Sequence, residues 1–100
     1  MNERFGNVNL QLPCDLEGEK SILATVFYTP DVFDTVIDRV GLEDFFSNAN
    51  REIFKVMHEL SREGTVISRA SVAHMLEKTG LLEAVGGVAY LGDLRDYQSS

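Results

Sequence analysis

The stretch ANREIFKVMHELSRE, residues 49–63, decides the fold class. Its apolar residues recur at helical spacing and share one face: Ile53, Phe54, Met57 and Leu60. Charged residues occupy the positions between them and can face water. Gly64 follows the stretch, and glycine is a common helix stop. The pattern therefore predicts a long amphipathic helix.

Similar patterns flank this helix on both sides. Before it, residues 15–28 and 30–40 each carry an apolar stripe, with a Thr-Pro break between them. After it, Ser68 is a suitable N-cap for a helix that ends at Gly80, and a glycine pair at 86–87 precedes a last helical pattern. No segment alternates for long enough to predict a strand.

The sequence thus predicts an all-α fold, a compact bundle of about five or six short helices. We expect a single domain over residues 13–100 and one helical turn at residues 42–46. Residues 1–12 are polar and lack a period, which favours a flexible N-terminal tail. The large apolar residues around the start of the long helix are expected in the core: Phe45, Phe46, Ile53 and Phe54.

The composition argues against several classes of protein. Hydrophobic residues make up 44% of the chain and charged residues 25%, which is typical of a globular domain. The net charge of −7 opposes direct binding to nucleic acid or to an anionic membrane. No apolar run is long enough to span a membrane. The single cysteine, Cys14, excludes an internal disulfide and fits a reducing, cytoplasmic setting.

Two carboxylate pairs have the spacing that an acid–base or metal site on a helix requires. Asp15 and Glu19 lie four residues apart, as do Asp34 and Asp38. Charges on amphipathic helices usually form the solvated face. We therefore expect both pairs to face solvent, and the alternative of a small acidic enzyme that uses such a pair with a metal is the less favoured interpretation.

No catalytic, cofactor-binding or metal-ligating motif is present in the sequence. His58 and His74 stand outside any metal-binding motif, and both are expected at or near the surface. The phosphate-binding glycine loop and the serine nucleophile motif are absent. Residues 69–78 could be taken for a DNA-recognition helix, but their cations are few and the net charge opposes DNA. A helix-turn-helix regulator is therefore a minor alternative.

Five short motifs stand in order along the chain. They are PCDLEGEKSIL at 13–23, DFF at 44–46, Arg51 with Ile53, Phe54 and Met57, GTVI at 64–67, and Leu82 with VGGVAYL at 85–91. Each resembles a motif of the N-terminal domain of DnaB-type bacterial replicative helicases, and their order is that of the family. The chain departs from the family pattern at Gly18, Val66 and Ser68, where Ala, Pro and Asp are usual.

The resemblance implies a domain that is not itself an enzyme. In this family the N-terminal domain forms a collar on a hexameric ring and pairs the subunits into dimers. It also helps to recruit a DnaG-type primase and, in some systems, a helicase loader during DNA replication. ATP and Mg belong to a separate ATPase domain further along the full-length protein, so we expect no cofactor in this chain. The chain would then be a fragment that ends where a helical hairpin should begin.

Tyr90 is the candidate partner-binding residue, because the resemblance maps it onto the tyrosine of the family's Gly-Gly-x-x-Tyr motif, in a region implicated in primase contact. The alternative role for Tyr90 is helix packing with its hydroxyl at the surface. A second interpretation of the whole chain is a stand-alone acidic helical protein that acts as a decoy or inhibitor of the helicase ring.

Overall fold

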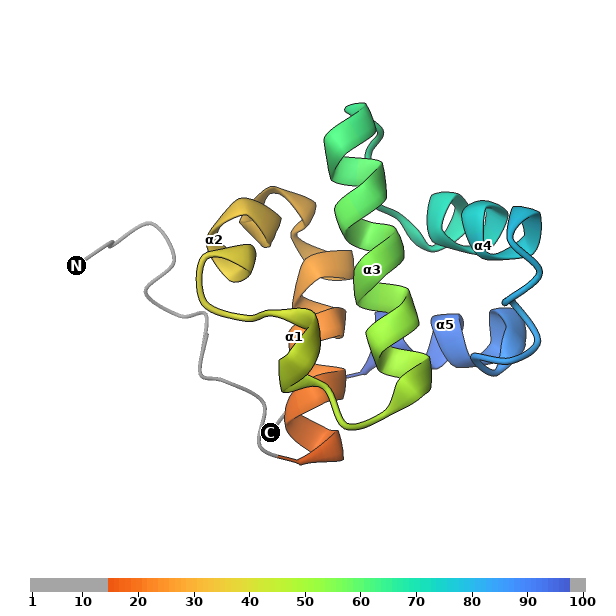
Figure 1. The fold of residues 1–100 in the computed structure, drawn as a ribbon, viewed down its shortest axis with the longest axis horizontal. Helices are drawn as coiled ribbons and strands as arrows, with labels where there is room; N and C mark the ends of the chain where they lie inside the picture. The colour runs from red at the N-terminus through yellow and green to blue at the C-terminus, as the bar shows by residue number, and fades with distance from the viewer. Residues whose placement is uncertain (1–14, 98–100) are drawn as a thin grey trace.

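Helix α3 (Asn48–Glu63) runs through the middle of the molecule in the computed structural model, which describes residues 15–97 (Figure 1). The element α2 lies on one side of it and α4 on the other, and α5 runs from beside α4 behind α3 toward α1. The remaining elements are α1 (Leu16–Tyr28), η2 (Pro30–Val32), α2 (Phe33–Ile37), η3 (Leu42–Asp44), α4 (Arg69–Lys78) and α5 (Gly87–Asp96). The predicted tail at 1–12 and Cys14 lie outside the described residues. The predicted all-α fold is confirmed.

The central helix forms as the sequence predicted. The hydroxyl of its N-cap Ser47 accepts a hydrogen bond from the Asn50 backbone N–H at 3.1 Å. Gly64 ends the helix with a φ of 76°, a left-handed conformation that glycine adopts without a steric penalty. The four residues of the predicted stripe are all buried, and Val56 and Asn50 join them on the inner face.

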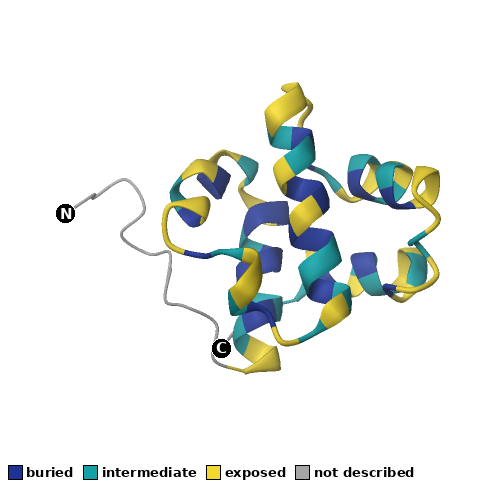
Figure 2. Ribbon diagram, in the orientation of Figure 1, coloured by how far each residue is buried: buried dark blue, intermediate teal, exposed yellow. Residues whose placement is uncertain are grey.

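The core lies where the inner faces of the helices meet around α3 (Figure 2). Helix α1 packs against both α3 and α5, and α4 packs against α3 and α5. The largest fully buried apolar side chains come from all five α-helices and from the segment before α3: Leu23, Phe33, Phe45, Ile53, Met57, Leu76, Leu91 and Leu94. Ser68 caps α4 as expected, and its hydroxyl accepts from the Ser71 N–H at 3.1 Å. No helix among residues 15–97 has both the length and the apolar character needed to cross a membrane.

The segment expected to be one helix at 30–40 is shorter and has two parts. The turn η2 is a 3₁₀ helix, and α2 then ends at Ile37. Thr35, Val36 and Ile37 are consecutive β-branched residues, which lose side-chain freedom in a helix and weaken it. Val40 is nevertheless buried, because the chain turns back toward the core after α2. The expected helical turn before α3 is present as η3.

One expected core residue was assigned wrongly. Phe45, Ile53 and Phe54 are buried, but the side chain of Phe46 is 77% exposed. The backbone at Phe45 is extended, with φ −102° and ψ 124°. Successive side chains of extended backbone point to opposite sides. Phe45 therefore points into the core, where its ring centroid lies 4.9 Å from that of Phe54, and Phe46 points to solvent.

The two neighbouring phenylalanines should differ sharply in their contribution to stability. We expect Phe45→Ala to lower the free energy of unfolding by about 3–5 kcal/mol, because it leaves a cavity in the core. Phe46→Ala should change it by less than about 0.5 kcal/mol, as exposed substitutions usually do. Urea unfolding followed by circular dichroism measures both. Equal losses in the two variants would contradict the assigned orientations.

Candidate functional site

Tyr90, the candidate partner-binding residue, lies in the first turn of α5 and is half buried. Its ring packs against the edge of the core. Its hydroxyl donates a hydrogen bond to Oδ1 of Asn50 at 2.6 Å. Asn50 is 1% exposed, and its Nδ2 in turn donates to Oε1 of Glu19 at 2.9 Å. The hydroxyl therefore takes part in an internal network rather than standing free at the surface.

Glu19 is the centre of this network and is 0% exposed. Its Oε2 accepts from the Phe46 backbone N–H at 2.6 Å, and its Oε1 accepts from the Ser47 N–H at 3.2 Å as well as from Asn50. These backbone groups lie at the start of α3, where unpaired N–H groups and the helix dipole favour a negative charge. A buried carboxylate needs such donors, since leaving it unpaired would be very costly. Glu19 thus caps α3 from a different helix.

The Gly-Gly-x-x-Tyr motif has a steric explanation. Gly86 has a φ of 112°, and a Cβ at this position would lie 2.8 Å from Cβ of Tyr90. Gly87 also has a positive φ, 71°, and its N–H donates to the Leu82 carbonyl at 2.8 Å. The two glycines let the chain turn tightly into α5 directly beside Tyr90. The motif therefore positions this tyrosine over Asn50.

Arg51 holds the same region from the other side. Its Nη2 donates to the Phe45 carbonyl at 2.6 Å, and its Nη1 donates to Oδ1 of Asn48 at 3.2 Å. The short segment 45–47 is therefore fixed by Arg51 at one residue and by Glu19 at the next two. Between these anchors the side chain of Phe46 is held outward in water. Exposed aromatic side chains are enriched at protein interfaces.

The electrostatic surroundings of Tyr90 follow from this packing. Burial raises the pKa of its hydroxyl above the ordinary value of 10.0. The hydrogen bond to Asn50 lowers the pKa, and the nearby charges of Glu19 and Asp93 raise it, so that the net shift is upward. Tyr90 is therefore protonated at neutral pH and acts as a hydrogen-bond donor.

The carboxylate pairs expected to face solvent behave differently from each other. Asp34 and Asp38 are exposed, as expected. Asp15 is exposed and caps α1, accepting from the Gly18 N–H at 2.7 Å. For Glu19 the expectation was wrong, because it lies three and four residues before Ile22 and Leu23 and so continues the buried stripe of α1. That spacing was the signal available in the sequence.

The remaining residues singled out from the sequence are the two histidines and Cys14. His58 and His74 are exposed, as expected. Within residues 15–97, no group of three His, Cys, Asp or Glu side chains comes together in a way that could hold a metal ion. Cys14 lies outside this part of the chain.

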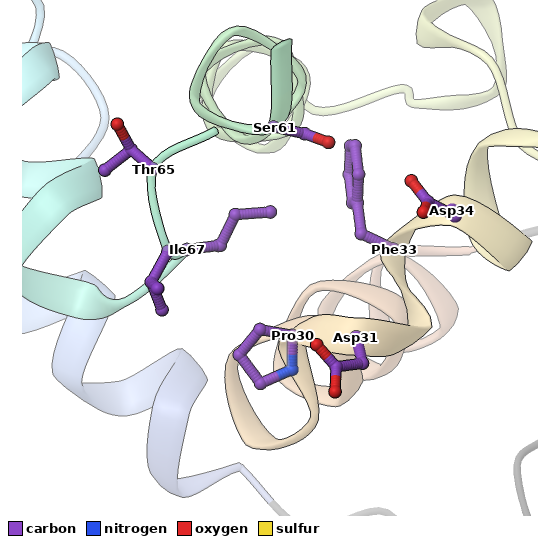
Figure 3. Close-up of a pocket in the computed structure, with 8 residues that line it drawn as sticks. Pro30, Asp31, Phe33, Asp34, Ser61, Thr65 and Ile67 are labelled. Atoms are coloured by element: carbon purple, nitrogen blue, oxygen red, sulfur yellow. The ribbon is translucent and has the colours of Figure 1, made fainter. Parts of the chain in front are cut away.

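A groove near the other end of α3 was not anticipated from the sequence. It has a volume of about 350 Å³ and is bounded by η2 and α2 on one side and by the connection after α3 on the other (Figure 3). Its lining residues are Pro30, Asp31, Phe33, Asp34, Ser61, Thr65, Val66 and Ile67. We call it the η2–α3 groove.

Comparisons with known proteins agree with the motif resemblance. Residues 11–100 match the family described as DnaB-like helicase N terminal domain. The replicative DNA helicase DnaB of Pasteurella multocida is 37% identical over 82 residues, which are 82% of this chain and 18% of that protein. The DnaB of Mycobacterium leprae is 31% identical over 93 residues, 93% of this chain and 15% of that protein. The chain thus spans less than a fifth of these relatives.

A solved structure is similar over most of the chain. The crystal structure of the N-terminal domain of DnaB helicase from Mycobacterium tuberculosis superposes with a TM-score of 0.80 at 30% sequence identity. The match covers 86% of this chain and 62% of that one. The helical arrangement around α3 is therefore shared with that domain.

Removing the Glu19 carboxylate should destabilise the fold. Glu19→Ala leaves the N–H groups of Phe46 and Ser47 without their buried acceptor, so we expect a loss of about 1–3 kcal/mol or more in the free energy of unfolding. Glu17→Ala on the same helix is the matched control, since Glu17 is exposed and should cost less than about 1 kcal/mol. Urea unfolding compares them. A loss from Glu19→Ala no larger than that of the control would contradict the capping role.

The Tyr90 hydroxyl should give stability that depends on alkaline pH. Because the folded state holds the phenol proton more tightly than the unfolded chain, this stability is complete below pH 10 and is lost as the pH rises through the raised pKa. We expect Tyr90→Phe to be less stable by about 1 kcal/mol at neutral pH. The difference from the unsubstituted chain should shrink above about pH 10. Urea unfolding at a series of pH values tests this, and a difference that widens above pH 10 would refute it.

Proposed function

This chain belongs to the family of DnaB-like helicase N-terminal domains, and we propose that it acts as the non-catalytic collar domain of a hexameric replicative helicase. In this role it pairs subunits of the ring and docks a DnaG-type primase, with a helicase loader as a further partner where one is used. ATP hydrolysis and unwinding belong to the ATPase domain of the full-length protein, which works in the cytoplasm. This domain itself binds neither nucleic acid nor membrane.

The observation that carries the docking proposal is the anchored surface at the start of α3. Tyr90 and the exposed Phe46 are linked through Asn50 and Glu19 by a continuous chain of hydrogen bonds. The hydroxyl of Tyr90 is held by Asn50 and the backbone of Phe46 by Glu19, so these groups lose less conformational freedom on association. Aromatic residues are also enriched at protein interfaces. Three residues of the family motifs, Glu19, Phe46 and Tyr90, therefore support one surface.

Charge supports the same kind of role. The chain carries 16 acidic residues and 9 basic ones. An acidic domain attracts basic protein surfaces and repels nucleic acid, because like charges across an interface are unfavourable. A protein-docking role fits this charge better than direct contact with the DNA substrate.

Titration calorimetry with the C-terminal domain of the cognate primase tests the docking role. We expect Tyr90→Ala to weaken binding by about tenfold or more, as for a residue that dominates an interface. Tyr28→Ala is the matched control, because Tyr28 is 85% exposed at the far end of α1 and away from Asn50. Its affinity should stay within about twofold of the unsubstituted chain.

Primase docking and subunit pairing, the two parts of the proposal, are tested by separate experiments. Absence of binding heat, even with the helical hairpin of the full-length protein restored, would contradict the primase role. Sedimentation of the chain with that hairpin tests subunit pairing independently. A strict monomer at all concentrations would contradict the pairing role.

A further inference from the structure

We propose that the η2–α3 groove binds a segment of a partner protein that presents a large apolar side chain flanked by lysine or arginine. Its lining includes Ser61 in the last turn of α3 and the connection that follows, whereas Asn50, the partner of Tyr90, lies in the first turn of α3. It is therefore a second surface, and the proposal does not depend on primase docking at Tyr90.

The shape of the groove suits a single apolar side chain. The side chains of Phe33 and Ile67 project into the groove from its two sides (Figure 3). They are only 2% and 4% exposed, so each adds a small area to an apolar floor. Val66 also lines the groove but is 72% exposed. The volume of the groove, about 350 Å³, is at the small end of the range for ligand pockets, which suits a side chain better than a cofactor.

The charge of the groove is negative. Asp31 and Asp34 both line it, and both are exposed. No lysine or arginine is among the lining residues. The ion pairs found among residues 15–97 are Arg62 with Glu59 and Arg95 with Asp96, so neither groove carboxylate is neutralised by a cation in that part of the chain. A cationic side chain beside the bound apolar one would find two acceptors.

Charge complementarity selects a basic protein segment as the occupant. A second copy of this chain would also carry a net charge of −7, so pairing through this acidic groove is opposed by like-charge repulsion. Nucleic acid and anionic lipid are opposed for the same reason. A basic segment with an apolar side chain matches both features of the groove. Its apolar side chain would bury Val66, and its cationic side chains would approach Asp31 and Asp34.

The probe for the test is a short amidated peptide with two leucines between pairs of lysines. It is titrated into the isotope-labelled full chain at low salt, and amide chemical shifts are followed by nuclear magnetic resonance. We expect the largest shifts at Val66, Ile67 and Asp34. A peptide with glutamate in place of lysine, and one with glycine in place of leucine, should each bind more weakly by about tenfold or more.

A matched pair of variants separates the groove from the overall charge. Asp34→Asn and Asp38→Asn remove the same charge from exposed positions, but only Asp34 lines the groove. We expect Asp34→Asn to weaken peptide binding by about threefold and Asp38→Asn to change it by less than about 1.5-fold. Val66→Asn should weaken binding by removing an exposed apolar side chain from the groove lining, without changing net charge.

Four outcomes of the peptide experiments would overturn the proposal. They are equal weakening by Asp34→Asn and Asp38→Asn, shifts centred on Phe46 or Tyr90 instead of the groove, equal binding of the glutamate peptide, and no shifts at millimolar peptide. Concentration-dependent self-association that blocks the peptide would assign the groove to a second copy of the chain, which also overturns it. Shifts centred on Tyr90 would place the basic peptide at the surface proposed for primase. The other outcomes do not bear on primase binding, which the calorimetry tests separately.

Discussion

The buried carboxylate of Glu19 at the start of α3 is the interaction on which the rest of the structure depends. It replaces the water that would otherwise satisfy the N–H groups of Phe46 and Ser47, and it sits at the end of the helix where a negative charge is favoured. Through Asn50 it also reaches Tyr90 on α5. One side chain of α1 therefore fixes where α3 begins and how α5 lies against it. The network thus joins α1, α3 and α5, and α1 also packs against both of the other two helices.

This arrangement explains why separate sequence motifs belong together. Glu19 comes from the first motif, Arg51 from the third and Tyr90 from the last, yet all three hold the same few residues around the start of α3. The glycine at position 86 is required by its closeness to Tyr90. Residues of these motifs therefore make the contacts that hold the helices against one another. The outward direction of Phe46 is a product of the same contacts.

Patterns that depend on a single helix could be predicted from the sequence, and features that depend on distant contacts could not. The stripe of α3 and its glycine stop follow from neighbouring residues, and both are present. The spacing of Glu19 before Ile22 and Leu23 indicated that it faces the core, although a charge on a helix is ordinarily taken to face water. Its hydrogen-bond partners, 27, 28 and 31 residues away, could not be predicted. The prediction that Phe46 is buried was wrong, because an apolar residue is ordinarily taken to face inward. Here the extended backbone directs its side chain to solvent. No pattern in the sequence predicted the η2–α3 groove, because its lining residues come from segments about 30 residues apart that meet only after folding.

The length of α3 has a consequence for how the two surfaces relate. At a rise of about 1.5 Å per residue, a helix of this length separates its ends by more than about 20 Å. At physiological ionic strength the Debye length is about 8 Å, so charges of the groove are screened from the surface around Tyr90. Packing could still couple the ends, since α3 is buried along one face and cannot shift at one end alone. The start of α3, however, is held by Glu19 and Arg51 through contacts that do not involve the groove. The start of α3 and the η2–α3 groove are thus separate surfaces of the domain, and the contacts that hold the first do not involve the second.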